Sequence, residues 1–453
     1  MGLWCVKIDR KRAAFLVVIC GVIAAVSAFA VIYRPPIAPI AKPDARLFSA
    51  DVIQRGAVLA AIGDCIVCHT TDGGVPYAGG RALPTPFGTL YATNITPDEA
   101  TGIGNWSREA FVRAMRDGVS RSGGHLYPAL PYEHFTHVDD ADLDALYAFL
   151  MTRDAVHASA PPNRLIFPLG FRAELAGWKL LFLHKGAFIP VPARSKEWNR
   201  GAYLVEGLGH CGGCHTPRNL AGGERGAHAF AGGVAEGWNA PPINVSSPAA
   251  KPWTVDSLYN YLHTGVDVDH SAAAGPMGPV CDDLSMVPEA DVRAIAIYVA
   301  SMMNQSATST VDRAGLAEKM HPAGAALFAG ACAGCHESGA PMNGQGRPPL
   351  SVVSAIAEDD PRNTLLVILE GIQPPVGARG SYMPPFADSL ADAEVAEVAA
   401  YLRVRYSSRA AWPKLTSAAA AARKQVVTPE MSMTGDPSGT HMMSMDQPIQ
   451  IRR

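Results

Sequence analysis

The sequence predicts a mainly α-helical protein in which three small domains follow one another behind a transmembrane helix at the N-terminus. Three observations lead to this fold class. A short motif, Cys-x-x-Cys-His, occurs three times, at residues 65–69, 211–215 and 332–336. Similar helical patterns surround each copy, and a chain of 453 residues suits about three domains. A long uncharged run lies near the N-terminus.

The repeated motif is the attachment signature of c-type haem. Each copy supplies two thiols that can form thioethers to one porphyrin edge, and the histidine that follows can bind the iron. A single copy could be a redox dithiol or half of a zinc site, but three copies that all end in His are not a coincidence. The sequence therefore predicts three covalently bound haem c groups and three tandem class I cytochrome c-like domains. The predicted attachment residues are Cys65, Cys68, Cys211, Cys214, Cys332 and Cys335, and the proximal iron ligands are His69, His215 and His336.

The N-terminal residues predict attachment to the cytoplasmic membrane. Four basic residues between positions 7 and 12 precede an uncharged run from Ala13 to Tyr33. This run is long enough to span a bilayer, and the basic flank favours a cytoplasmic N-terminus. A cleaved signal peptide with its site at residues 28–30 is the alternative. Because apolar residues continue beyond that site, we expect residues 1–34 to be a retained anchor, with the haem domains in the periplasm.

Each predicted domain begins and ends with a helix of recurring pattern. The first helix is rich in small residues and contains a glycine, at Gly56, Gly201 or Gly324. The last helix has an acidic residue followed by apolar residues one, four, seven and eight positions later, and this spacing forms one apolar stripe. We therefore expect the two helices of each domain to pack together. Each predicted domain also has a middle helix between these two, at residues 106–118, 253–265 and, in a shorter version, 361–371.

These patterns divide the chain. The predicted domains cover residues 44–155, 193–304 and 319–407, with an apolar connecting segment at 156–192 and an Ala-rich, then Met-rich, disordered tail at 413–453. The connecting segment is either a strap packed against the haem domains or a surface that faces the membrane or a partner protein.

Met277 and Met383 are the predicted sixth ligands of the second and third haems. A haem that transfers electrons has both axial positions filled, and Met opposite His raises its potential. Each of these methionines lies beside prolines on a loop that precedes the last helix of its domain, and the prolines stiffen the loop. Met286, an alternative in the second domain, is closer to the last helix.

The first domain has Leu130 at the corresponding place, and a leucine side chain cannot bind iron. We expect His134 to be the sixth ligand there, with His125, Met115 or an unfilled position as alternatives. Ligation by two histidines would give the first haem the lowest potential, because imidazole is a stronger donor to ferric iron than a thioether.

From about residue 51 to residue 406 the chain resembles the three-haem cytochrome c subunits of membrane-bound bacterial dehydrogenases. The resemblance rests on residues 85–89, 93–98, 127–132, 198–205 and 214–219 and on the two methionine loops. It implies that a partner subunit oxidises the substrate and that this chain passes electrons to ubiquinone. The cytochrome subunits of quinoprotein alcohol dehydrogenases have Met where this chain has Leu130. With this departure and the Arg34-Pro35-Pro36 sequence after the apolar run, the chain more closely resembles the branch that serves molybdenum hydroxylases such as aldehyde, nicotinate and isoquinoline oxidoreductases. That branch implies a molybdopterin catalytic subunit and a small iron–sulfur subunit as partners.

Two alternative functions stay open. The chain could be the cytochrome subunit of a quinoprotein alcohol dehydrogenase or a flavoprotein sugar-acid dehydrogenase. It could also be a multi-haem peroxidase that uses an open iron in the first domain. Nucleic acid is not an expected partner, because 38 basic residues nearly balance 41 acidic ones.

Overall fold

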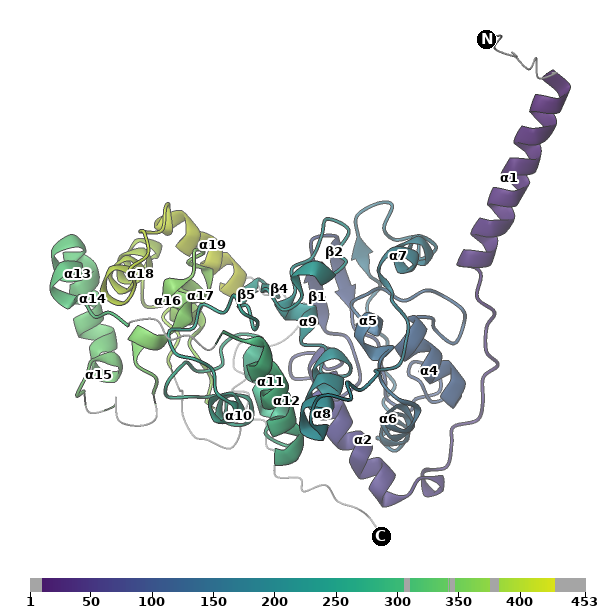
Figure 1. Ribbon diagram of the computed structural model, residues 1–453, viewed down its shortest axis with the longest axis horizontal. Helices are drawn as coiled ribbons and strands as arrows, with labels where there is room; N and C mark the ends of the chain where they lie inside the picture. The colour runs from purple at the N-terminus through teal and green to yellow at the C-terminus, as the bar shows by residue number, and fades with distance from the viewer. Residues whose placement is uncertain (1–9, 305–309, 341, 343–346, 375–382, 428–453) are drawn as a thin grey trace.

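The computed structural model describes residues 10–304, 310–340, 342, 347–374 and 383–427. Figure 1 shows three helical units in a row, with one helix that projects from the end formed by the first unit. The predicted fold class is confirmed in that the protein is mainly helical and has one apolar helix near its N-terminus.

The projecting helix is α1, Arg10–Ile32. Its stretch Ala14–Ile32 has a mean hydropathy of 2.9, and none of it is buried within the protein. A core helix of similar composition would be mostly buried, so this exposure agrees with a membrane span. A signal sequence has the same features, and retention of the helix stays a prediction.

The first unit combines helices with a small sheet. Its elements are η1 Ala45–Leu47, α2 Ala50–Ile62, α3 Cys65–Cys68, β1 Ala82–Thr85, β2 Gly88–Tyr91, α4 Arg108–Asp117, α5 Tyr132–Phe135 and α6 Asp140–Met151. The side chains of Ser49, Ser107 and Asp139 accept hydrogen bonds from backbone amides at the starts of α2, α4 and α6. These caps satisfy amides that have no partner inside the helix. The sequence did not indicate the strands, because runs of four residues are too short for alternation to be recognised.

The connecting segment contains β3 Arg164–Leu165 and α7 Glu174–Phe182. β3 pairs antiparallel with β2 and completes a sheet of order β1-β2-β3. α7 contacts α1.

The second unit repeats the order of the first. Its elements are α8 Lys196–Glu206, α9 Gly212–His215, η2 Gly226–His228, β4 Gly233–Ala235, β5 Trp238–Ala240, α10 Val255–Thr264, α11 Met277–Leu284 and α12 Glu289–Met302. β4 and β5 form a two-stranded antiparallel sheet. The first two units share one hydrophobic core.

Within its described residues the third unit contains helices and loops but no named strand. Its core is distinct from that of the first two units and also includes Trp238 of β5. Its elements are α13 Ala314–Met320, α14 Pro322–Leu327, the π-helical turn η3 Phe328–Cys332, α15 Ala333–His336, η4 Leu350–Val352, α16 Ser354–Ala357, α17 Arg362–Glu370, α18 Asp392–Tyr406 and α19 Leu415–Val427.

Helix α19 corrects part of the predicted disordered tail. The prediction assigned disorder to residues 413–453, but residues 415–427 form a helix that packs against α17 and α18 and buries Ala419 and Ala422. The small alanine side chains allow α19 to pack closely against its neighbours. The Ala-rich composition did not indicate this contact, because it does not show which side of a helix is buried. Residues 428–453, with the Met-rich part of the tail, lie outside the described residues.

The predicted contact between the first and last helices is present in all three units, and a glycine lies at each crossing. A Cβ atom on the glycine would meet a carbonyl oxygen of the last helix: Ala145 at 2.0 Å from Gly56, Ala294 at 1.9 Å from Gly201 and Glu397 at 2.2 Å from Gly324. Four residues later each last helix carries the aromatic residue that completes the contact, namely Phe149, Tyr298 or Tyr401. Only glycine permits such a close approach of two backbones.

Candidate functional site

The first motif forms a single helical turn, α3, shortly after α2. Cys65 and Cys68 are free thiols at its two ends. His69 follows, and its Nδ1 donates a hydrogen bond of 2.6 Å to the carbonyl oxygen of Thr93. Burial lowers the pKa of His69, so the ring is neutral at pH 7. Because Nδ1 holds the proton, Nε2 presents the lone pair that a metal ion binds.

The second motif repeats this geometry. Cys211 and Cys214 are free, and His215, at the end of α9, is buried. Its Nδ1 lies 2.7 Å from the carbonyl oxygen of Pro241. Pro241 directly follows β5, as Thr93 closely follows β2. The small sheets thus place the carbonyl groups that orient the two histidines.

The third motif is held by a contact through the residue that follows its histidine. Cys332 and Cys335 are free, and burial lowers the pKa of His336. Glu337, the next residue, accepts hydrogen bonds of 2.8 and 2.6 Å from Arg405 of α18. This ion pair ties the motif to the last helix of its unit.

The residues of the motifs fit a c-type haem. In the first two units, two free thiols lie on one helical turn, and the neighbouring imidazole has one nitrogen fixed by a carbonyl oxygen and the other available. The cysteines would carry the thioethers, and the histidines would bind the iron through Nε2. Bound haem c supplies one-electron redox chemistry.

A common turn follows the middle helix of each unit. α4, α10 and α17 end at glycines with positive φ, namely Gly118 (58°), Gly265 (75°) and Gly371 (71°). The residue after each glycine forms an antiparallel bridge with a later residue: Val119 with His125, Val266 with Ala272 and Ile372 with Met383. The turn therefore sets where the following loop begins.

This register relates the loops of the first two units. Leu130 lies five residues after His125, and Met277 lies five residues after Ala272. Leu130 therefore holds the place in the first unit that Met277 holds in the second.

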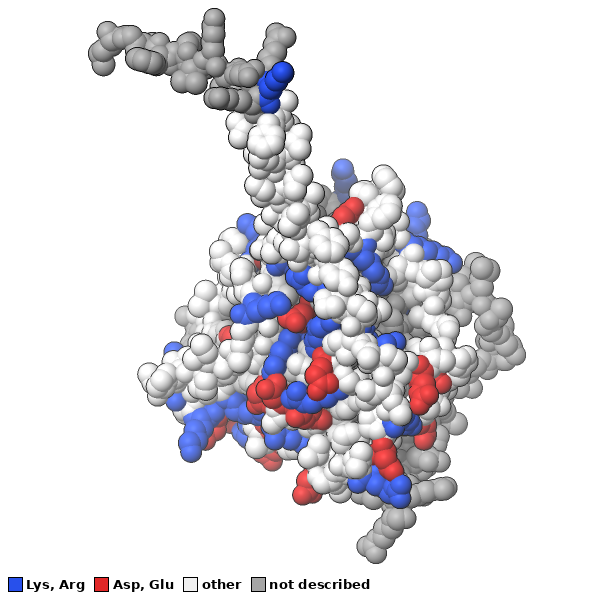
Figure 2. All heavy atoms as spheres, turned by 90° about the vertical axis from the view of Figure 1, so that its right-hand side faces the viewer, with Lys and Arg blue, Asp and Glu red and all other residues white. Residues whose placement is uncertain are grey.

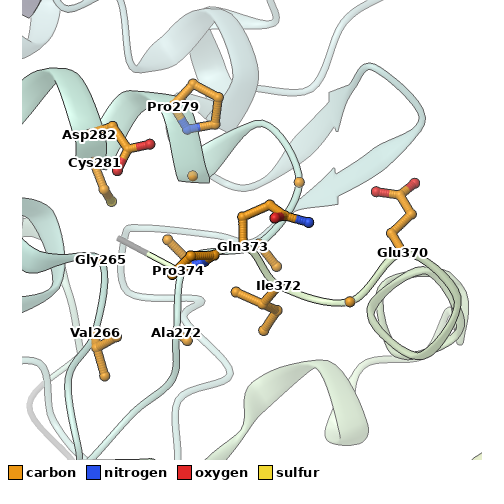
Figure 3. A pocket seen from close by; sticks show the side chains of 15 residues that line it. Gly265, Val266, Ala272, Pro279, Cys281, Asp282, Glu370, Ile372, Gln373 and Pro374 are labelled. Carbon is orange, nitrogen blue, oxygen red and sulfur yellow. The ribbon is translucent and has the colours of Figure 1, made fainter. Parts of the chain in front are cut away.

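Both predicted methionine ligands are half-buried. Met277 begins α11, and Met383 exchanges two hydrogen bonds of 2.9 Å with the backbone of Ile372. A cavity of about 330 Å³ is lined by residues on either side of Met277 and by residues 370–374 of the third unit, and Figure 3 shows Pro279, Cys281 and Asp282 across it from Ile372, Gln373 and Pro374. The fold thus brings the surroundings of Met277 and residues 370–374 to one interface between units. Ligation of iron by these methionines stays a prediction.

His134 lies between the first two units. Its Nδ1 is 2.9 Å from the carbonyl oxygen of Glu206, and its Nε2 is 2.8 Å from a carboxylate oxygen of Glu224. The ring also borders Gly212 of the second motif, where a Cβ would be 2.9 Å from Cε1. To bind iron, His134 would have to give up one of its two hydrogen bonds. Its predicted role as the sixth ligand of the first haem stays a prediction.

The alternative ligands of the first unit are also buried. His125 donates from Nε2 to the carbonyl oxygen of Ile32 over 2.9 Å, and its Nδ1 lies 3.0 Å from Nζ of Lys179. His125 therefore binds the end of α1 and the connecting segment. Met115 lies in the hydrophobic core.

The structure brings the first two motifs together, which the sequence did not indicate. His210, just before the second motif, lies with Nε2 3.4 Å from the carbonyl oxygen of Gly63, just before the first. Arg81 donates to the carbonyl oxygen of Val67 inside the first motif and forms an ion pair of 2.9 Å with Glu236 of the second unit. The first two motifs thus lie side by side at the junction of their units.

A pair of carboxyl groups at this junction also escaped the sequence analysis. Asp64 precedes the first motif, and Asp283 belongs to α11 of the second unit. Burial raises the pKa of both groups, and the neighbouring Asp283 raises that of Asp64 further. A single acidic residue before a motif gives no signal in the sequence, so only the fold reveals the pair.

Comparison with protein families gives two matches within the chain. Residues 53–154 match the family model "Cytochrome c", and residues 320–402 match "Cytochrome C oxidase, cbb3-type, subunit III". These regions contain the first and third motifs.

Three curated relatives are similar to most of the chain. It is 48% identical to one of the subunits of nicotinate dehydrogenase from Pseudomonas putida over 86% of this chain but only 33% of that protein, so it spans about a third of that relative's length. The gluconate 2-dehydrogenase cytochrome c subunit of Pantoea cypripedii is 37% identical over 78% of this chain and 85% of its own length. The cytochrome c subunit of the quinone-dependent alcohol dehydrogenase of Gluconobacter oxydans is 35% identical over 79% of each chain.

Proposed function

Because the chain belongs to the family of cytochrome c subunits of membrane-bound bacterial dehydrogenases, we propose that it carries three haem c groups and passes electrons from a catalytic partner to ubiquinone. Its role in electron transfer follows from the family. The number of haems, the identity of the partner and the quinone are our inferences.

The proposed number of three haems rests on the likeness between the first two units. The second unit repeats the first in the glycine at its helix crossing, in the bond from the motif histidine to a carbonyl group, and in the turn after its middle helix. A segment that shared only the five letters of the motif would not reproduce these three features. The second motif is therefore expected to bind haem as the first does.

The haem content of single variants tests this proposal. We expect three haems per full-length chain, and two in the Cys211→Ser/Cys214→Ser variant, as measured by the pyridine haemochrome assay against protein mass. Cys281→Ser is the matched control, because Cys281 is a buried thiol outside the motifs, and it should retain three. An unmodified chain with two haems, unchanged by the Cys211→Ser/Cys214→Ser exchange, would contradict the proposal.

The placement of the chain at the membrane is supported by α1. A helix that exposes an apolar stretch of 19 residues is unfavourable in water and suits the interior of a bilayer. We infer that α1 anchors the chain in the cytoplasmic membrane, with the haem-binding units in the periplasm. Recovery of a mature chain that begins near Val31 would show instead that α1 is cleaved.

The proposed partners are a molybdopterin subunit and a small iron–sulfur subunit. Two observations support them: identity is 48% to the nicotinate dehydrogenase relative, compared with 37% and 35% to the gluconate and alcohol relatives, and Leu130 holds the place of Met277 in the first unit. Purification of the native complex from membranes tests this choice by its content of molybdenum and iron–sulfur clusters. A quinoprotein or flavoprotein partner would overturn it.

A further inference from the structure

The connecting segment exposes a group of large apolar side chains, which we call the α7 surface. Its members and their exposed fractions are Phe167 (86%), Phe171 (60%), Leu180 (70%) and Leu181 (68%). Such a cluster is unfavourable in water and marks a surface that something else covers. We propose that the α7 surface inserts into the periplasmic leaflet of the membrane beside α1.

Helix α7 has its apolar side chains on both faces, and only one face is packed. Ala176 and Lys179 are buried, and Trp178 lies edge-on against Tyr132. The opposite face presents Leu180 and Leu181, whereas a helix on a water-facing surface normally presents polar residues there. The bare face is therefore not needed for the fold of the first unit.

Contacts hold α7 at the point where α1 ends. His125 donates to the carbonyl oxygen of Ile32, the last residue of α1, and Lys179 of α7 lies 3.0 Å from the same ring. Arg172 donates to the carbonyl oxygen of His125 over 2.8 Å. Figure 1 accordingly shows α7 at the edge of the body level with the foot of α1. A helix so fixed lies at the depth of the lipid headgroups if α1 spans the bilayer.

Charge around the surface suits a bilayer. Of the four Lys or Arg residues in residues 163–191, Lys179 is buried, whereas Arg164, Arg172 and Lys185 are exposed, against one acidic residue, Glu174. Basic residues beside an apolar face favour anionic lipid headgroups. Figure 2 shows mostly uncharged surface around the foot of α1. Because this surface is continuous with the exposed apolar helix α1, lipid is its natural occupant rather than a protein.

Photolabelling of the full-length chain tests the proposal. The haem-loaded protein is reconstituted in vesicles of phosphatidylglycerol and phosphatidylethanolamine that contain a phospholipid with a diazirine on its acyl chain, and adducts are mapped by mass spectrometry. We expect adducts on residues 166–182 as well as on α1. Leu47 is the matched control, because it is 77% exposed and ends η1, which closely precedes α2. Figure 1 shows α2 at the end of the first unit away from the foot of α1, so Leu47 should carry no adduct.

A variant sharpens the result. Leu180→Gln/Leu181→Gln changes two exposed side chains, so it should keep its haems while the adduct yield on α7 falls at least threefold and that on α1 does not change. The inference rests on the proposed anchor, and the outcomes separate the two. Adducts on α1 without adducts on α7 overturn the inference alone, whereas the absence of adducts on α1 overturns the anchor. Loss of the α7 adducts when the catalytic partner is bound would show a protein interface and also overturn the inference.

Discussion

Gly201 of α8 touches the carbonyl group of Ala294 in α12 so closely that a Cβ atom at position 201 would lie 1.9 Å from the oxygen. Gly201→Ala is therefore expected to push the two helices apart. Overpacking of this kind costs about 1–3 kcal/mol, and more where backbone must move. The prediction is a lower melting temperature of the second unit, measured by calorimetry on the holoprotein.

Gly177→Ala is the control for this change. Gly177 lies within helix α7, and a Cβ there would meet nothing within 4 Å. Alanine should be neutral or stabilising by about 0.4–1 kcal/mol, because it restricts the unfolded chain. Equal melting temperatures for the two variants would show that the close approach at Gly201 is not required.

Arg405 should be essential for the third unit. Its buried guanidinium binds Asp312 over 2.8 Å and Glu337, the neighbour of His336, over 2.6 Å. Arg405→Met removes charged hydrogen bonds to two carboxylates that are themselves 40–49% exposed, and we expect it to lower the free energy of unfolding by about 1.5–3 kcal/mol. The hydrogen bond from Arg405 lowers the pKa of Glu337, so this stabilisation is lost as pH falls through that pKa.

Denaturant unfolding followed at the third haem measures the effect of Arg405. Arg409→Met is the control, because Arg409 is exposed and lies 3.9 Å from an exposed Asp359. It should change the free energy of unfolding by less than about 0.5 kcal/mol. If the two variants were equally stable, the bonds of Arg405 would not stabilise the motif.

Met277→Leu should remove the predicted sixth ligand of the second haem. Leucine keeps the apolar volume but offers no sulfur to iron, so one haem should become five-coordinate and bind carbon monoxide. Optical spectra of the reduced protein measure this change. Met286→Leu is the control and should leave the spectra unchanged; a reversed outcome would assign the ligand to Met286.

His134→Ala tests the predicted sixth ligand of the first haem. If His134 binds iron, the variant should bind carbon monoxide at one haem and lose the lowest of its midpoint potentials. Redox titration and carbon monoxide spectra provide the measurements. If every haem stays low-spin with unchanged potentials, His134 serves only the interface described by its bonds to Glu206 and Glu224.

Lys179 should make stability depend on pH. Burial lowers the pKa of Lys179 from 10.5 to about 7 in the folded protein. Between these two values the unfolded chain binds more protons, so the free energy of unfolding should rise with pH across that window. Lys179→Met lacks this contribution. The melting temperature of the natural chain, minus that of the variant, should therefore increase from about pH 7 to pH 10; a constant difference would contradict the prediction.

The sequence alone determined the features that are local. A cysteine pair and the histidine beside it occupy five consecutive residues, so their chemistry can be recognised without a fold. The apolar stripes can be recognised from helical periodicity, and the glycines at positions 56, 201 and 324 recur near the start of each domain. The structure confirms the helix crossings that these patterns predict. Helix α19 was missed because alanine-rich sequence signals neither a buried nor an exposed face.

Tertiary structure decided how distant segments meet. The carbonyl groups of Thr93 and Pro241 lie more than twenty residues after their histidines, and no local pattern links them. His134 was assigned from its distance along the chain to Leu130, but packing of two units engages both of its nitrogens. The place of α7 beside α1 depends on the path of the whole first unit. Contacts of this kind depend on how loops close between packed helices, and a one-dimensional pattern does not contain that information.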